Sequence, residues 1–111
     1  MSTLTPLATI AEVDAAAAGR TVPRDFLGLV AANPASPALH SMRDDGGWTV
    51  WTLQQFADQV AKAAAGLQAA DVGAGEQVLL MMRNRPDFHW FDAAAQFLRA
   101  TPVSIYNSSS P

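Results

Sequence analysis

The sequence contains no cysteine and few charged residues. The absence of cysteine excludes a disulfide scaffold, a thiolate metal site and a cysteine nucleophile, and it fits a reducing compartment. Only 15% of the residues are charged, the net charge is −3, and the seven Lys and Arg residues are scattered, with Arg83 and Arg85 as the closest pair. We therefore expect no nucleic-acid partner and no attraction to an anionic membrane surface.

Long hydrophobic runs are also missing. The longest strongly apolar stretch, residues 78–82, is far too short to cross a bilayer, so we expect no transmembrane segment. The first residues do not resemble a signal peptide, because no positive charge precedes Arg20 and because Glu12 and Asp14 interrupt the apolar stretch. These features together predict a cytoplasmic location.

Alanine supplies much of the hydrophobic half of the 111 residues, and it favours helix while burying little surface. A chain of this length suffices for one domain. The larger apolar residues cluster after Val22, where we expect the core. Thr5-Pro6 predicts the start of a helix over residues 6–18 that ends at Gly19. We interpret residues 1–20 as a peripheral helical arm.

A short helix and a β-hairpin are predicted next. Apolar residues at helical spacing begin at Val22, and Asn33-Pro34 ends this helix because the residue before proline avoids the α region. Two strands, residues 38–43 and 48–51, flank the turn Asp44-Asp45-Gly46-Gly47, where glycine supplies the positive φ. The sequence therefore predicts an antiparallel hairpin.

Trp48 and Val50 share one face of the second hairpin strand, and we expect Trp48 to lie in the core or against a partner. Thr52 and Gln55 form a capping box that starts a helix ending near residue 70. The apolar stripe of this helix comprises Leu53, Phe56, Ala57, Val60, Ala64 and Leu67.

The last third of the sequence predicts one parallel βαβ unit. Residues 77–82 form a strand, Asn84-Arg85-Pro86-Asp87 starts a helix that ends near residue 99, and Pro102 opens a strand over residues 103–106. This helix is expected to bury Phe88, Phe91, Ala94, Ala95 and Leu98, with Trp90 packed in the core instead of forming an exposed patch.

The predicted fold class is therefore α/β. The strand over residues 77–82 is apolar throughout and needs cover on both faces, which one helix cannot supply. We therefore expect the chain to be the opening piece of a larger α/β protein. An unfinished sheet leaves a strand edge open, so we also expect a homo-oligomer formed through the exposed sheet edge.

Residues that could carry chemistry have simpler structural interpretations. Gly73-Ala74-Gly75 precedes a strand instead of opening a helix, so it is a loop and not a dinucleotide fingerprint. Ser108-Ser109-Ser110 lacks the Gly and Lys of a phosphate loop and is interpreted as a helix cap. His89 and Asp92 could pair on a helix surface but have no third metal ligand nearby. The other residues that could carry chemistry are also interpreted as structural. His40 lies in a strand, Asp44-Asp45 belongs to a turn, and Met81-Met82 packs in the core.

Several segments, in this order, resemble the adenylate-forming enzymes. They are Thr49-Val50-Trp51-Thr52 with the helix to Leu67, Val72-Gly73-Ala74-Gly75-Glu76-Gln77-Val78, Asn84-Arg85-Pro86-Asp87-Phe88, and residues 100–111. The last segment, with Tyr106-Asn107-Ser108-Ser109-Ser110-Pro111, is most similar to the long-chain fatty acyl-CoA synthetases. The resemblance covers about residues 26–111. It departs from the family pattern at Asp71, at Glu76-Gln77 in place of Asp-Arg, and at Arg85 in place of a Ser cap.

The resemblance implies that residues 21–111 are the truncated N-terminal part of the large domain of an AMP-binding enzyme. The implied activity of the full-length protein is long-chain fatty acid–CoA ligation. A fatty carboxylate attacks the α-phosphate of Mg·ATP to give acyl-adenylate and pyrophosphate, and the thiol of coenzyme A then displaces AMP. ATP, Mg²⁺ and CoA are thus implied for the full-length enzyme, and its peripheral association with a membrane stays open.

The family's functional motifs match nothing in this sequence. Its phosphate loop with a lysine, its Thr-Glu segment, its ribose-binding Asp and its C-terminal Lys correspond to no residue between Met1 and Pro111. We therefore predict no catalytic, cofactor-binding or metal-ligating residue here, no ATP binding, and no activity of this chain alone.

Reasoning from the residues alone leaves two other hypotheses open. The first is a stand-alone α/β interaction or oligomerisation module without catalysis. The second is a small flavodoxin-like binding domain, which is disfavoured because only one parallel crossover is predicted and no strand-end loop is built for phosphate.

Overall fold

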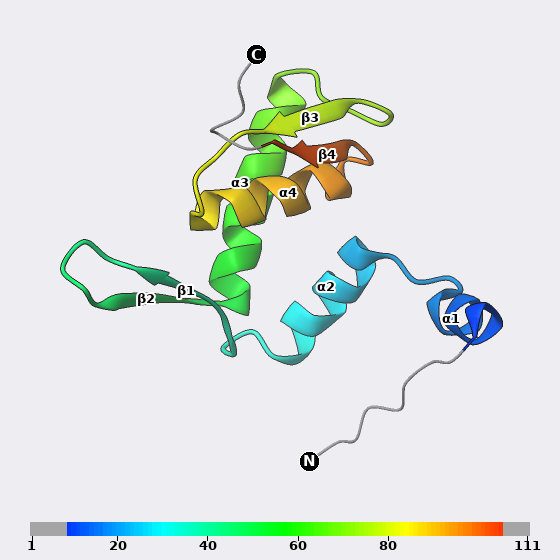
Figure 1. Ribbon diagram of the computed structural model, residues 1–111, viewed down its shortest axis with the longest axis horizontal. Helices are drawn as coiled ribbons and strands as arrows, with labels where there is room; N and C mark the ends of the chain where they lie inside the picture. The colour runs from blue at the N-terminus through cyan, green and yellow to red at the C-terminus, as the bar shows by residue number, and fades with distance from the viewer. Residues whose placement is uncertain (1–8, 106–111) are drawn as a thin grey trace.

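In the computed structural model, which describes residues 9–105, helices pack around two separate two-stranded sheets (Figure 1). The elements, in chain order, are α1 (Ile10–Ala17), α2 (Val22–Ala32), β1 (Pro37–Met42), β2 (Trp48–Thr52), α3 (Leu53–Ala69), β3 (Gln77–Leu80), α4 (Pro86–Phe97) and β4 (Thr101–Ser104). The predicted α/β class is confirmed, and the predicted order of helices and strands is observed.

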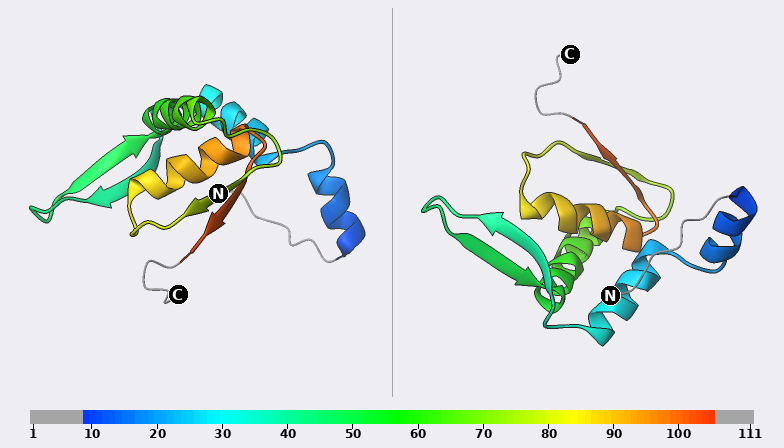
Figure 2. Two further views of the ribbon diagram at one scale, coloured as in Figure 1. Left: turned by 90° about the horizontal axis from the view of Figure 1, so that it is seen from above. Right: turned by 60° about the horizontal axis from the view of Figure 1, so that its bottom comes forward.

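Helix α1 stands apart from the other elements in all three ribbon views (Figures 1 and 2). Among the described residues it starts at Ile10, where the Thr9 side chain caps it by accepting a hydrogen bond from the Glu12 amide at 3.1 Å. The predicted cap, Thr5, lies outside the described residues. Gly19 follows the helix with φ of +71°, as its predicted role at the helix end requires. No residue of α1 is buried.

The β1–β2 hairpin leads directly into α3. The strands pair antiparallel, with Leu39 opposite Trp51 and Met42 opposite Trp48. Residues 48–51 alternate in exposure as predicted. Trp48 is on the outer face and 57% exposed, so of its two predicted places the core is wrong, whereas contact with a partner stays a prediction. The reason is that the described elements cover the hairpin only on the face that carries Trp51.

The predicted capping box at the start of α3 is confirmed. The Thr52 hydroxyl accepts from the Gln55 amide at 3.1 Å, and the Gln55 side chain accepts from the Thr52 amide at 2.9 Å. This reciprocal pair satisfies two amides that the first helical turn leaves without partners. It therefore sets the point at which the hairpin becomes a helix.

Replacing Thr52 by alanine is expected to lower the unfolding free energy by about 0.5–2 kcal/mol, because the Gln55 amide loses its acceptor. Urea denaturation followed by circular dichroism measures this loss. Thr52→Ser is the matched control, since it keeps the hydroxyl group and should retain most of the stability. Equal losses for the two variants would mean that the Thr52 methyl group, and not the cap, matters.

The core lies between α3 and α4, which cross in contact (Figure 2). Its buried members are Val60 and Ala63 from α3 and Trp90 and Ala94 from α4. The prediction that Trp90 packs in the core is confirmed. Phe88, Phe91 and Leu98, which were predicted to be buried, are only partly buried.

Strands β3 and β4 pair in parallel, with Leu79 opposite Val103, and α4 connects them. This is the predicted βαβ unit, although β3 ends at Leu80 and β4 starts at Thr101. Leu80 is buried, whereas Leu79 is 66% exposed and Met81 is 59% exposed. The prediction that Met81 packs in the core is therefore wrong, because the described helices cover only one face of this sheet.

Candidate functional site

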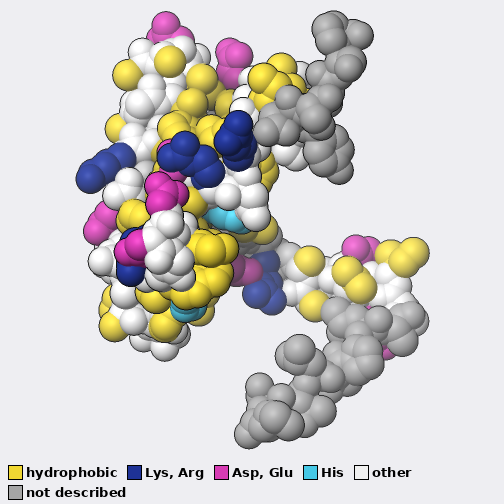
Figure 3. Space-filling view, turned by 60° about the vertical axis from the view of Figure 1, so that its left-hand side comes forward, with side chains coloured by type: hydrophobic (Ala, Val, Ile, Leu, Met, Phe, Trp, Pro, Cys, Tyr) yellow, Lys and Arg dark blue, Asp and Glu magenta, His cyan; other side chains and the backbone are white. Residues whose placement is uncertain are grey.

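A groove of about 840 Å³ lies between the hairpin and the start of α4. The hairpin supplies one wall and the segment that leads into α4 supplies the other. The lining residues are Leu39, His40, Ser41, Met42, Asp44, Trp48, Trp51, Asn84, Arg85, Pro86, Asp87, His89 and Trp90. Viewed from the hairpin side, the molecule presents both of its histidines among hydrophobic side chains (Figure 3).

Tryptophan rings form the floor of the groove. The rings of Trp51 and Trp90 meet edge-to-face with centroids 5.2 Å apart, and the Phe56 ring lies 6.4 Å from that of Trp90. The Trp51 indole N–H donates to the Ser41 hydroxyl at 3.4 Å. This floor is rigid and apolar because the rings that build it also belong to the core.

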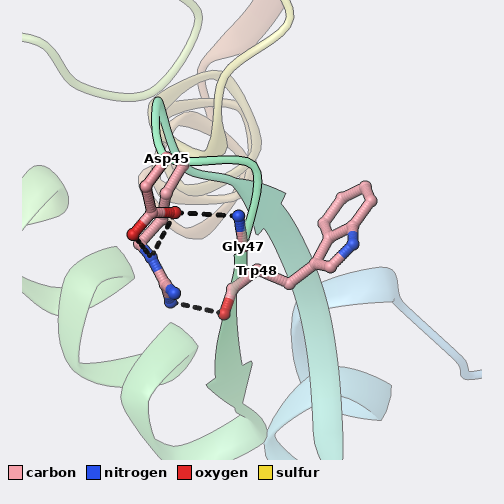
Figure 4. A network of polar contacts seen from close by, with 4 residues as sticks. Asp45, Gly47 and Trp48 are labelled. Atoms are coloured by element: carbon pink, nitrogen blue, oxygen red, sulfur yellow. Dashed lines mark hydrogen bonds and ion pairs between the residues drawn. The ribbon is translucent and has the colours of Figure 1, made fainter.

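The hairpin tip that carries Asp44 is held by a network of polar contacts (Figure 4). The Arg43 guanidinium donates to the Trp48 carbonyl at 2.7 Å and pairs with the Asp45 carboxylate at 3.2 Å, which also accepts from the Gly47 amide at 2.8 Å. A Cβ atom at Gly47 would collide with the Arg43 guanidinium. The Trp48 indole points away from the network. The predicted turn role of Asp44-Asp45 is thus confirmed.

The start of α4 forms the polar side of the groove. Pro86 occupies the first turn as predicted, and Asp87 follows it where a negative charge opposes the helix dipole. Arg85 is the N-cap residue but its side chain caps no amide. The groove therefore combines an apolar floor with charged groups at its rim.

The predicted His89–Asp92 pair is not formed. The Asp92 carboxylate accepts from the Gln96 side chain at 3.1 Å, and the His89 ring packs edge-on against Phe88, with centroids 5.6 Å apart. His40 lies in β1, opposite Val50. Among residues 9–105, no group of three or more His, Asp or Glu side chains is placed to hold a metal ion.

Two further segments, residues 73–75 and 108–110, were interpreted from the sequence as a loop and a helix cap. Residues 73–75 form the predicted loop before β3, and Gly75 has the positive φ, +82°, that glycine tolerates. Ser108-Ser109-Ser110 lies outside the described residues. Within residues 9–105, no helix combines the length and the hydropathy needed to cross a membrane.

Sequence reasoning missed the groove itself. Its walls come from segments about forty residues apart, and nothing in either segment indicates that they face each other. The only available signal was an excess of tryptophan, three residues in 111, all of which line this groove.

The chain was compared with models of known protein families. The model of the family described as "AMP-binding enzyme" matches residues 29–111. The match starts inside α2 and includes both sheets, α3 and α4.

Two curated proteins illustrate the sequence similarity. The chain is 40% identical over 72 residues to an uncharacterized protein of Mycobacterium tuberculosis, covering 65% of this chain and 41% of that protein. It is 36% identical over 66 residues to the long-chain-fatty-acid–CoA ligase FadD15 of Mycobacterium bovis, covering 60% of this chain and 11% of the ligase. The chain thus spans about two fifths of the first of these proteins and about a tenth of the second.

Among solved structures, the N-terminal subdomain of Klebsiella oxytoca NpsA in complex with 3-hydroxybenzoyl-AMSN superposes with a TM-score of 0.71. The sequence identity is 25%, and the superposition covers 82% of this chain and 22% of that chain. The fold described above therefore matches about a fifth of that N-terminal subdomain.

Proposed function

We propose a ligase function on one premise: this chain belongs to the AMP-binding enzyme family, whose model matches residues 29–111. Members of this family form adenylates. The proposal is that residues 21–111 are the N-terminal part of the large domain of such an enzyme and that residues 1–20 are a peripheral arm. The family match carries this proposal, and the superposition on an N-terminal subdomain supports it.

The proposed substrate of the complete enzyme is a long-chain fatty acid, and the proposed acyl acceptor is coenzyme A. Two observations support this choice: the similarity to the ligase of Mycobacterium bovis, and the sequence Tyr106-Asn107-Ser108-Ser109-Ser110-Pro111, which resembles that branch of the family. An aromatic acid or a different acceptor is the alternative, since the superposed NpsA structure contains an aromatic acyl-AMSN.

The proposed reaction has two steps, adenylation of the acid and transfer of the acyl group to coenzyme A. A carboxylate oxygen attacks the α-phosphate of ATP and pyrophosphate leaves; the thiol of coenzyme A then attacks the acyl carbon and AMP leaves, with the thiol proton released. The described residues do not fit a Mg²⁺ site, because no suitable acidic cluster is present among residues 9–105. We therefore assign them no step of the reaction.

The role proposed for this part of the enzyme is structural. The α3–α4 core holds the β3–β4 pair in place, and the parallel pair is the start of the sheet on which the rest of a large domain would be built. A cytoplasmic location belongs to the same proposal, because ATP and coenzyme A are available there.

Pyrophosphate exchange into ATP tests the proposal, using the product of the complete reading frame that contains this sequence. We expect exchange that depends on palmitate and is at least about tenfold weaker with 3-hydroxybenzoate, a discrimination of about 1.4 kcal/mol. The 111-residue chain alone should show no exchange and no ATP binding by calorimetry.

Other results of the exchange and ATP-binding measurements would contradict particular parts of the proposal. Exchange only with 3-hydroxybenzoate would keep the adenylate-forming function and contradict the fatty-acid substrate. Micromolar binding of ATP by the 111-residue chain would contradict our assignment of no nucleotide site to it. No exchange with any acid would favour a second candidate, a protein-interaction module, which the uncovered face of the β3–β4 sheet supports.

A further inference from the structure

The tip of the β1–β2 hairpin contains a peptide bond with chemistry of its own. Asp45-Gly46 is the only Asp-Gly or Asn-Gly pair in the 111 residues. In such a pair the backbone nitrogen after the acidic residue can attack the side-chain carbonyl carbon, because the attack closes a five-membered ring. Glycine favours this attack, since it has no Cβ atom to shield its nitrogen.

The reaction has two steps, ring closure with loss of water and ring opening by water. The Gly46 nitrogen bonds to Cγ of Asp45 while a Cγ–O bond breaks, and the amide hydrogen and the carboxyl OH leave as water. A water molecule then opens the succinimide ring at one of its two carbonyl carbons. One opening restores the aspartate, whereas the other leaves an isoaspartyl linkage in which the main chain runs through Cβ and Cγ. No oxidant, reductant or cofactor takes part.

The folded hairpin holds both carboxylate oxygens of Asp45 (Figure 4). The Arg43 Nε–H donates to Oδ1 at 3.2 Å and to Oδ2 at 3.3 Å, and the Gly47 amide donates to Oδ1 at 2.8 Å. The Arg43 guanidinium is itself fixed, because it also donates to the Trp48 carbonyl at 2.7 Å. Whichever oxygen leaves as water must therefore first be released from at least one hydrogen-bond donor.

The attacking nitrogen is engaged as well. The Gly46 amide donates to the Arg43 carbonyl at 3.0 Å, and the Arg43 amide donates to the Gly47 carbonyl at 2.7 Å. These two hydrogen bonds close the turn, and the Gly46 N–H must leave its acceptor before the nitrogen can attack. All the groups involved belong to residues 43–48, so the arrangement does not depend on any other part of a larger enzyme.

We propose that Asp45 is a site of isoaspartate formation and that Arg43 protects it in the folded protein. The Arg43 side chain holds the carboxylate, and its carbonyl holds the attacking N–H. An isoaspartyl linkage adds one carbon atom to the main chain and so moves Gly46 and Gly47 out of register with Arg43. The modification would therefore loosen the tip of the hairpin that forms one wall of the groove. The proposal does not rest on the ligase activity.

Isoaspartate content after storage tests the proposal. The product of the complete reading frame is kept for several weeks at mildly acidic pH, and peptide mapping with electron-transfer fragmentation measures the isoaspartyl fraction at position 45. We expect the folded wild-type protein to isomerise at least about tenfold more slowly than the same protein unfolded in urea, since only the folded chain keeps these hydrogen bonds. This comparison needs no variant, so it holds even if a variant fails to fold.

Arg43→Gln tests the protecting residue. It is expected to raise the rate in the folded protein roughly fivefold, because glutamine cannot hold both the carboxylate and the Trp48 carbonyl. Thr52→Ala is the matched control for general loss of stability, since it weakens the start of α3 and leaves the contacts of Arg43 intact. Its rate should equal that of the wild type. Asp45→Glu should give no isomer, because its longer side chain would have to close a larger ring.

Three results would overturn the proposal. Equal rates in folded and urea-unfolded wild-type protein would mean that the fold gives no protection. Equal rates for Arg43→Gln and the wild type would mean that the protection does not come from Arg43. An increase of the same size in Arg43→Gln and Thr52→Ala would assign the effect to lost stability instead of to the contacts of Arg43.

Discussion

Trp90→Ala is expected to lower the unfolding free energy by about 3–5 kcal/mol. The Trp90 side chain is 8% exposed, lies edge-to-face with Trp51 at 5.2 Å, and belongs to a cluster of buried residues that joins α3 to α4. Removing the indole loses its burial and leaves a cavity beneath the groove. Small domains have only about 5–15 kcal/mol of stability in total, so this variant should be largely unfolded at 37 °C.

Trp48→Ala is the matched control, because it removes the same side chain from a position that is 57% exposed. Its effect should stay below about 1 kcal/mol, as for most surface substitutions. Thermal and urea denaturation followed by near-UV circular dichroism measure both variants. Similar losses at the two positions would contradict the burial of Trp90 and the exposure of Trp48.

Ala94→Leu is expected to have the second largest effect, a loss of about 1–3 kcal/mol. Ala94 is completely buried on the face of α4 that contacts α3, and Ala95 beside it is also completely buried. The small alanine side chains allow the two helices to approach closely. Three added carbon atoms can be accommodated only if α4 moves away from α3 or if side chains leave their preferred rotamers.

Ala65→Leu provides the control for Ala94→Leu. Ala65 is in the interior of α3 and is exposed, so the added side chain reaches solvent and the stability should change by less than about 0.5 kcal/mol. The same urea denaturation series measures both variants. An unchanged stability of Ala94→Leu would mean that the α3–α4 contact is loosely packed.

Boundaries that depend on neighbouring residues were predicted well. The Thr52–Gln55 capping box starts α3, and Pro86 starts α4, as the sequence indicates. The turn between β1 and β2 and the end of α2 at Asn33 were also predicted. These features involve hydrogen bonds or φ restrictions within about four residues, and the sequence displays them directly.

Burial was predicted less well. The α3 stripe omitted Ala63, which is buried, and Met81 was assigned to the core although it is exposed. A helical wheel or a strand alternation identifies which residues share a face, but it does not identify what packs on that face. The groove illustrates the same difficulty, because it exists only where the hairpin lies beside α4.

By itself, the sequence determined the order of the elements, the capping and turn residues, and the resemblance that family comparison then established for residues 29–111. Only the tertiary structure decided that Trp51 and Trp90 meet in the core while Trp48 is exposed, and which face of the β3–β4 sheet the helices among residues 9–105 leave uncovered. The physical reason is how far apart in the sequence the interacting residues are. Caps and turns result from interactions between near neighbours, whereas burial depends on contacts between segments that are distant in the sequence.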